Sequence, residues 1–291
     1  MFKNITYRVA HKLAKFLKNY IKRVDVKRHA INKSIEAREW DKHFNDGKFF
    51  EYNLLGELKM NLYKDSVLSK PIYEGFEVDE MSFLQSTLRE GDTFLDIGSN
   101  IGLFSLLASK KVGSTGKVIA FEPTPLTYSR FQENIILNNF SNIDVRQLAL
   151  SNTKGEMKFY ISNNGYDAWN SLAPGHDDKL QESISVPVST LDSELQDEDK
   201  TKISLVKIDV EGWEKFTLLG GKSFFENYAP IVMVEFTEQN TFNAGYMVQD
   251  IYNVLIEMGY SWYRIENKTL IPDAMRLRYP YTNLIAKKLK V

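Results

Sequence analysis

A run of small and acidic residues, DIGSNIG at positions 96–102, has the composition of a nucleotide-binding turn. It follows the apolar β-type residues 93–95 and precedes residues 103–108, whose apolar pattern is typical of a helix. Strand, tight turn and helix begin a βαβ unit, and the turn of such a unit is where nucleotides bind. The candidate contact residues are Asp96, Gly98, Ser99, Asn100 and Gly102.

The pattern D-x-G-x-N-x-G differs from the dinucleotide fingerprint G-x-G-x-x-G, because Asn100 stands where many nucleotide turns have glycine. A second acid, Glu122, ends the next strand-like run about 26 residues after Asp96. Acids that bind a ribose follow such a turn at a similar spacing, about 20 residues. The acids predict a nucleoside ligand without phosphates, and the missing G-x-G-x-x-G pattern weighs against a dehydrogenase. The alternative for Glu122 is an acid at a helix start, before Pro123.

Six stretches, in one order, resemble the FkbM family of class I S-adenosylmethionine (SAM) dependent methyltransferases. They are DIGSNIG (96–102), GKVIAFEP (116–123), ENIILNN (133–139), VRQLALSN (145–152), VPVSTLD (186–192) and KIDVEGWE (207–214). The resemblance covers roughly residues 74–236, and KIDVEGWE with VSTLD upstream is its most specific part.

The resemblance implies methyl transfer from SAM, held by the turn residues and by Glu122. It also places Ala149, after the third strand, near the adenine. Glu77 matches an acid just upstream of the nucleotide turn in the family, and its alternative is an acid in the first turn of a helix.

Two acids lie at the end of the predicted fourth strand, at 205–209, and just after it. Methyltransferases that act on the amino groups of DNA bases often carry an Asn/Asp-Pro-Pro-aromatic motif at this place. Here the sequence has Asp209 and Glu211 and no proline. A carboxylate at this place can take the proton of a hydroxyl as its oxygen is methylated. The two acids, with Glu235 at the end of the next strand, could instead hold a divalent cation such as Mg²⁺, Mn²⁺ or Ca²⁺. The alternative for Glu211 is a helix cap.

The loop at 163–171 mixes amides with two aromatic residues, a combination that suits a sugar acceptor. Trp169 offers a ring for stacking, and Asn170 and Ser171 match a short signature of the resembled family. His176, just beyond, is a candidate base, although a single histidine in a loop is more often simply solvated.

Alternating strand and helix patterns predict an α/β fold with a doubly wound, mostly parallel sheet. Strands are expected at 93–96, 118–121, 144–148, 155–162, 205–209 and 231–235, with an edge strand at 185–189; helices are expected at 76–88, 103–111, 125–138, 215–221 and 247–258. Residues 261–265 and 283–286 should form a closing antiparallel hairpin, and 50–63 two short strands. We expect three regions: a basic amphipathic helical extension (1–45), a lead-in segment (46–90) and the methyltransferase domain (91–291).

The chain has no cysteine, so disulfides, thiolate nucleophiles and cysteine metal ligands are excluded. Its net charge of −1 does not suggest a nucleic-acid partner. Residues 1–30 nevertheless carry nine Lys or Arg and one acid, with an apolar stripe at helical spacing. That segment either lies on an anionic membrane or a partner enzyme, or packs on the protein's own domain. Without a signal-peptide core we expect a cytoplasmic protein, with a membrane-peripheral location as the option that residues 1–30 leave open.

The leading interpretation is a SAM-dependent O-methyltransferase that acts on a hydroxyl of a sugar or glycan. The alternatives are a natural-product or other small polar acceptor and, from another class, a non-catalytic SAM-binding module that assembles other enzymes. The retained acids at 96, 122, 209 and 211 argue against the last.

Overall fold

The computed structural model describes residues 18, 22, 24–29, 32–162, 170–173 and 181–288. The chain divides into two compact units, Met1–Phe50 and Glu51–Val291. In the first unit residues 32–42 are helical. Most of the basic segment 1–30 lies outside the described residues, so its membrane or partner contact stays a prediction. The division at 45 and 90 also stays a prediction, and residues 51–90 fall within the second unit.

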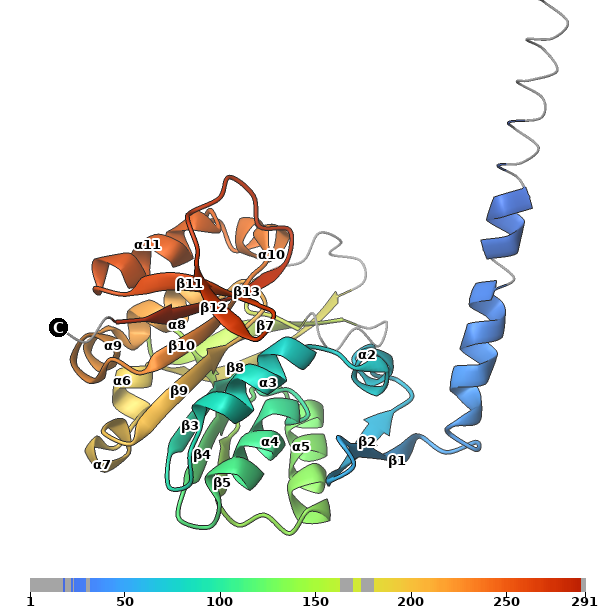
Figure 1. The fold of residues 1–291 in the computed structure, drawn as a ribbon, viewed down its shortest axis with the longest axis horizontal. Coiled ribbons are helices and arrows are strands. Elements are labelled where there is room, and N and C mark those ends of the chain that lie inside the picture. Colours follow the sequence, from blue (N-terminus) through green and yellow to red (C-terminus); the bar gives the residue numbers. More distant parts are fainter. Residues whose placement is uncertain are drawn as a thin grey trace, which may run out of the picture. The chain divides into compact units, whose positions relative to one another are not determined.

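An eight-stranded sheet forms the centre of the second unit, in the order β12-β11-β13-β10-β9-β3-β4-β5 (Figure 1). Its strands are β3 (Thr93–Ile97), β4 (Lys117–Phe121), β5 (Ile143–Arg146), β9 (Ile203–Ile208), β10 (Ile231–Phe236), β11 (Ser261–Glu266), β12 (Thr269–Pro272) and β13 (Thr282–Lys287). The strands from β10 to β5 run parallel, and β13 pairs antiparallel with both β10 and β11. The predicted α/β class, with an antiparallel terminal strand, is confirmed.

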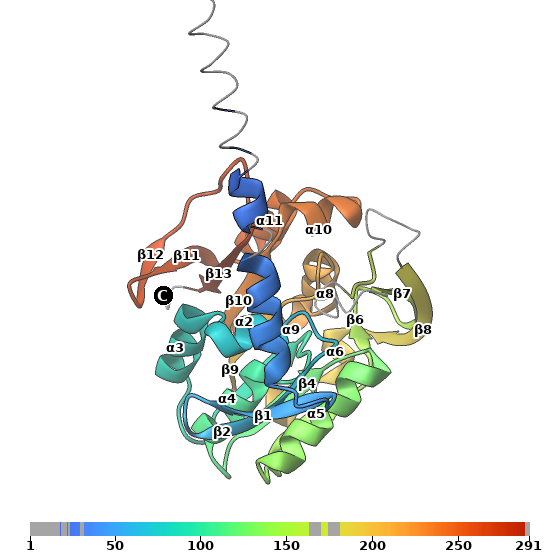
Figure 2. The same cartoon turned by 90° about the vertical axis from the view of Figure 1, so that its right-hand side faces the viewer.

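Helices cover both faces of this sheet (Figures 1 and 2). One set comprises α2 (Ser69–Glu74), α3 (Val78–Thr87), α4 (Leu103–Val112) and α5 (Pro125–Leu137). The other comprises α6 (Leu191–Glu194), α7 (Asp197–Lys200), α8 (Glu214–Gly220), α9 (Lys222–Tyr228), α10 (Glu238–Asn243) and α11 (Gln249–Glu257). No helix of the described part of the chain is long and apolar enough to cross a membrane.

The alternation of side chains along the strands separates an apolar face from a charged one. Leu95 and Ile97 on β3, and Val206 and Ile208 on β9, join the large apolar core with α8, α9 and α11. The intervening residues point to the other face, as the period of two requires. They include Asp96 and Lys207, which are neighbours in the β3–β9 register. Two ionisable groups are therefore buried beneath α4.

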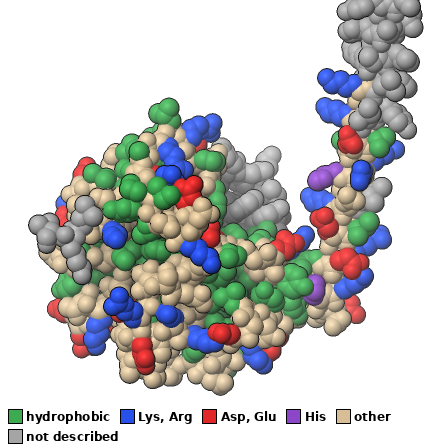
Figure 3. Space-filling model, viewed as in Figure 1, with side chains coloured by type: hydrophobic (Ala, Val, Ile, Leu, Met, Phe, Trp, Pro, Cys, Tyr) green, Lys and Arg blue, Asp and Glu red, His purple; other side chains and the backbone are tan. Residues whose placement is uncertain are grey.

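Smaller elements border the sheet. β1 (Phe49–Leu54) and β2 (Leu58–Tyr63) form a two-stranded sheet, as expected from 50–63. β6 (Ala149–Leu150), β8 (Gln181–Ser189) and β7 (Gly155–Ser162) form a three-stranded sheet in the order β6-β8-β7. The expectation of an edge strand at 185–189 is wrong, because β8 is the central strand of that small sheet. On the space-filling surface, acidic, basic and hydrophobic side chains are mixed over the face shown in Figure 3.

The closing hairpin differs from the expectation in one respect. β11 and β13 do pair antiparallel, but the tight turn at Asn267 and Lys268 leads from β11 into β12, which takes the sheet edge. β13 returns between β10 and β11 after a loop over 273–281. This return places residues of the loop and of β13 near the carboxyl ends of the parallel strands.

The backbone of the turn after β3 is in close contact with the backbone of the turn after β9. Gly98 has a φ of +82°, and a Cβ built on it would lie 1.8 Å from the carbonyl oxygen of Asp209. The Asp209 backbone N–H donates to the carbonyl of Ile97 at 3.0 Å. Glycine is therefore required here both by the left-handed backbone and by the close approach.

We expect Gly98→Ala to lower the free energy of unfolding by much more than Gly56→Ala, measured by urea denaturation. Gly56 has a φ of +72°, but a Cβ added to it would have no atom within 4 Å, so its variant isolates the left-handed strain, about 1–2 kcal/mol. Equal losses in the two variants would show that the backbones of the two turns do not meet as closely as the structure has them.

Candidate functional site

The residues of the predicted nucleotide turn, 96–102, lie at the end of β3 and in the segment that leads into α4. Asp96 is 1% exposed and accepts a hydrogen bond from Ser105 Oγ of α4 at 2.5 Å. Burial raises the pKa of Asp96 to about 6, although Lys207 and Ser105 act in the opposite direction. Ser99 is buried, and its N–H and Oγ both point to the carbonyl of Phe121. The structure thus fixes these two polar groups from within the fold.

Asn100 and Glu122 bridge the ends of β3 and β4. Asn100 has a φ of +48°, and its backbone N–H donates to Glu122 Oε2 at 3.1 Å. The other oxygen of Glu122 accepts from the backbone N–H of Thr124 at 2.9 Å and from its hydroxyl. These bonds fix the Glu122 carboxylate between the ends of β3 and β4. The position of Gly102 is dictated by packing, since a Cβ there would lie 2.3 Å from the Phe131 ring.

The two remaining candidate cofactor contacts come from β6 and from the start of α3. Ala149 is buried in β6 and packs in a small cluster with Phe159 and Val188. Glu77 is the N-cap residue of α3, in a left-handed conformation. Its Oε1 accepts from Tyr281 Oη and from Asn283 Nδ2, both at 2.8 Å. Glu77 therefore points toward the carboxyl ends of the sheet rather than into solvent.

Lys207, a buried lysine on β9, lies close to these acids. Lys207 is 4% exposed, its ammonium lies 2.6 Å from Asp209 Oδ2, and it sits 4.7 Å from the centre of the Phe104 ring. Burial alone would lower its pKa, but the negative charges of Asp209, Glu77 and Asp96 together raise it. Lys207 is therefore a charged group among three carboxylates.

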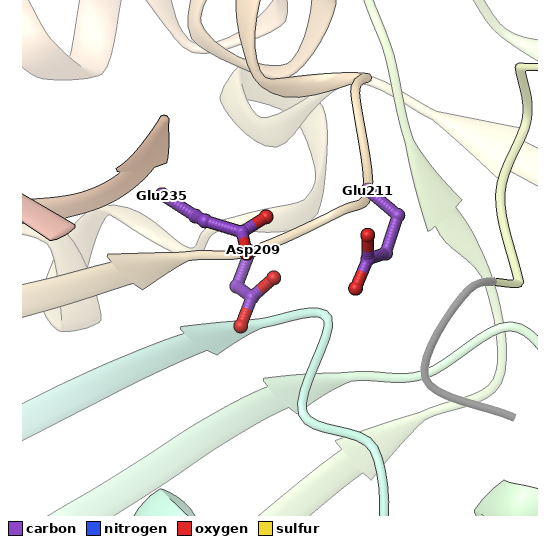
Figure 4. A group of neighbouring side chains, drawn as sticks. All are labelled: Asp209, Glu211 and Glu235. Carbon is purple, nitrogen blue, oxygen red and sulfur yellow. The ribbon is translucent and has the colours of Figure 1, made fainter. Parts of the chain in front are cut away.

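Three carboxyl groups converge beyond the strand ends (Figure 4). One oxygen from each of Asp209, Glu211 and Glu235 lies within 4.8 Å of the others. Glu211 accepts from Asn240 Nδ2 of α10 at 2.5 Å, whereas Glu235 Oε2 is buried without a hydrogen-bond partner among the described residues. Burial first, and then the neighbouring acids, raise the pKa of Glu211 and of Glu235 well above the usual range. The cluster can hold a proton or a cation.

A further acid, Glu214, forms hydrogen bonds to the backbone of the turn that carries Asp209 and Glu211. Glu214, 1% exposed, accepts from the backbone N–H groups of Val210 and Gly212, both at 3.1 Å. Burial raises its pKa to about 7. Glu211 itself has a φ of +52°, which is unfavourable for a residue with a side chain. The hydrogen bonds to Glu214 thus stabilise a turn with a strained backbone.

The predicted acceptor loop is described only at its end. Residues 163–169, which include Trp169, and His176 lie outside the described residues. Asn170 is half-buried, and Ser171 is buried with its Oγ donating to the carbonyl of Glu211 at 2.7 Å. Ser171 therefore joins the acceptor loop to the carboxylate cluster, while Asn170 stays a candidate.

Several residues of this site were not among the sequence candidates. Lys207 and Glu214 lie inside KIDVEGWE, and a lysine within a buried strand signals that carboxylates must surround it. Asn240, Tyr281 and Asn283 come from α10 and from the end of the chain. No local pattern marks them, because the sheet topology alone brings them to the site.

Comparison with known proteins identifies the family of this chain. The sequence profile of the methyltransferase FkbM domain matches residues 96–262, more than half of the chain. The protein belongs to the FkbM methyltransferase family. It therefore carries a SAM-dependent methyltransferase domain.

Three similar proteins illustrate the range of the family. The hexuronic acid methyltransferase AglP of Haloferax volcanii is 29% identical over 62% of this chain and 68% of its own length. The 31-O-demethyl-FK506 methyltransferase FkbM of Streptomyces tacrolimicus is 31% identical over 46% of this chain, which spans 60% of that relative. A solved methyltransferase FkbM from Methylobacillus flagellatus is 13% identical, with 75% of this chain and 54% of that chain covered and a TM-score of 0.44.

We expect Glu214→Ala to lower the free energy of unfolding by about 1–3 kcal/mol, because two backbone donors lose their acceptor. Glu214→Gln keeps an acceptor oxygen and should restore most of that loss. The raised pKa means that the stability which the protonated Glu214 provides is present below its unfolded pKa of 4.5 and lost as pH rises through about 7.

The wild type should therefore lose stability between about pH 5 and about pH 8, whereas Glu214→Gln lacks this titration. The free energy of unfolding of Glu214→Gln, relative to that of the wild type, should thus rise over this range. Urea denaturation at the two pH values measures this difference. A constant difference would show that Glu214 does not titrate between them.

Proposed function

We propose that this protein transfers the methyl group of SAM to a hydroxyl of a sugar or glycan. The observation that carries the proposal is the cluster of Asp209, Glu211 and Glu235, which lies directly beside the nucleotide turn. In parallel α/β sheets, ligands bind at the carboxyl ends of the strands, where both features are found.

The methyl donor is assigned to the turn after β3. Glu122 would accept the ribose hydroxyls, and Asp96 and Asn100 would contact the rest of the molecule at the turn. Gly98, Ser99 and Gly102 shape the backbone that faces it, with Ala149 toward the adenine and Glu77 on the opposite side. The sulfonium methyl would then be directed toward Asp209, since the two turns are in contact.

The chemistry needs a hydroxyl oxygen about 3 Å from the methyl carbon and in line with the C–S bond. The oxygen donates an electron pair to the methyl carbon, the C–S bonding pair passes to sulfur, and neutral S-adenosylhomocysteine leaves. Asp209 would accept the hydroxyl proton, with Lys207 as the positioning residue that fixes its carboxylate. The three carboxylates also fit a hard divalent cation, which would polarise the acceptor oxygen when bound.

The acceptor class rests on the hydrogen-bonding character of the site and on AglP, a relative named for hexuronic acid methylation. Asn170, Ser171 and Glu235, with Trp169 in the adjoining loop, would bind the acceptor. FkbM of Streptomyces tacrolimicus, named for an FK506 hydroxyl, favours a natural-product acceptor as the second candidate. Mass spectrometry of purified protein with SAM and a panel of glycans would separate the two.

Asp209→Asn should retain SAM binding, measured by calorimetry, and lose about 10²–10⁴-fold in kcat, the contribution of a general base. The matched control is Asp250→Asn, since Asp250 forms a similar pair with Lys215 at 2.7 Å but belongs to α11. Wild-type turnover in Asp209→Asn would remove both the base and the cation role from this carboxylate.

If the carboxylates hold a cation, the protein should bind Mn²⁺, and Glu235→Gln should weaken that binding about 10-fold or more. Electron paramagnetic resonance of free Mn²⁺ measures the affinity without turnover, and Asp250→Asn should bind as the wild type does. Activity that survives EDTA, together with no Mn²⁺ binding, would leave Asp209 as a base alone.

A further inference from the structure

A cavity of about 510 Å³ opens beside the proposed reaction site, between the start of α3 and the strands β11 and β13. Its apolar wall includes Phe76 and Tyr281, and Tyr281 remains 49% exposed. An aromatic wall beside polar groups suits a sugar ring, because the CH faces of the ring stack on aromatic side chains while its hydroxyls form hydrogen bonds.

The cavity reaches the carboxylate cluster through one shared wall. Glu77 lines it and is bonded to Tyr281 and Asn283, which line it too. Asn283 lies directly opposite Glu235 in the β10–β13 register. Asn283 Oδ1 and Glu235 Oε2 are both buried and have no hydrogen-bond partner among the described residues. Asn283 thus joins the wall of the cavity to Glu235 of the carboxylate cluster.

The cavity has one acidic and one basic side. Glu77, Asp79 and Glu80 come from the start of α3, whereas Arg264 and Arg276 come from β11 and from the loop before β13. A ligand in the cavity would therefore meet both carboxylates and guanidinium groups.

The two arginines retain capacity for an anion. Both contact the same buried carboxylate, Asp273, whose side chain is 2% exposed. The other acid beside Arg264 is Glu266, half exposed on the surface, where an ion pair contributes little. The arginine side chains are 39% and 41% exposed, and each guanidinium has five donors, more than these acids occupy.

We propose that this cavity extends the acceptor site beyond Asn170, Ser171 and Glu235, and that Arg264 and Arg276 select a glycoside that bears a carboxylate. The inference rests on the proposed function. The sugar ring lies against Tyr281, the carboxylate meets the arginines, and a ring hydroxyl points past Glu77 and Asn283 to Asp209. Arginine suits this role because its planar donors match a carboxylate in a bidentate geometry. The methyl transfer itself is the one written above.

The test uses two ligands that differ only in the oxidation of one carbon: 4-nitrophenyl β-D-glucuronide and 4-nitrophenyl β-D-glucoside. Saturation-transfer NMR measures their binding to the full chain loaded with S-adenosylhomocysteine, and mass spectrometry measures methylation with SAM. The variants are Arg276→Gln and Arg264→Gln. The control is Arg278→Gln, since Arg278 is 79% exposed, pairs with Glu238 and does not line the cavity.

We expect the wild type to bind the glucuronide about 10-fold or more tightly than the glucoside, the effect of a hydrogen-bonded charge. Arg276→Gln should remove most of that preference and leave glucoside binding within about 2-fold, whereas Arg278→Gln should keep it. No preference in the wild type, a preference that survives in both cavity variants, or no binding of either glycoside would each overturn the inference.

The two proposals fail separately. Arginine-dependent binding of the glucuronide without methylation of any glycan would uphold the subsite and contradict the proposed function. Methylation of both glycosides at equal rates would uphold the proposed function and contradict the selection of a carboxylate.

Discussion

The ammonium of Lys207 is the interaction on which the reaction site depends. A lysine in a central strand, 4% exposed, would be costly without compensation, because moving a charge out of water is expensive. Asp96 on the neighbouring strand, Asp209 beyond its own strand and Glu77 from α3 supply that compensation. The ammonium lies 2.6 Å from Asp209 and attracts Asp96 and Glu77 electrostatically, so it links the turn after β9 to the end of β3 and to the start of α3.

One ammonium does not balance all the acids nearby. Asp96, Glu77, Glu211, Glu214 and Glu235 all have raised pKa values, with burial as the largest cause. A buried excess of carboxylates favours positively charged ligands, and the proposed donor carries its positive charge on the sulfur that bears the methyl group. Methyl transfer turns that sulfonium into a neutral thioether, so the electrostatic attraction for the cofactor ends with the reaction. The excess of acids would thus favour binding of SAM over retention of the product.

The sequence predicted most of the sheet and part of the site, for a physical reason. Strands such as 93–96 and 155–162 carry their own periodicity, so they could be located without tertiary information. Asp209, Glu211 and Glu235 could be placed together because the carboxyl ends of parallel strands share one edge. The role of Asn283 could not be predicted, since it depends on the return of β13 beside β10, and that of Asn240 depends on how α10 packs against the turn after β9. The edge assignment of 185–189 failed because β8 pairs on both sides outside the main sheet.

The turn after β9 shows how the fold maintains a strained arrangement at the site. Glu211 occupies a left-handed backbone region, which costs about 1–2 kcal/mol. Gly212 must follow, because a Cβ there would lie 2.5 Å from the carbonyl of Asn240. The two backbone hydrogen bonds to the Glu214 carboxyl group offset this cost, since each contributes about 0.5–1.5 kcal/mol. One oxygen of the Glu211 carboxylate lies within 4.8 Å of an oxygen of Asp209 and of Glu235. The strained residue is therefore one of three acids within one ligand's reach, and the bonds to Glu214 stabilise the turn that presents it.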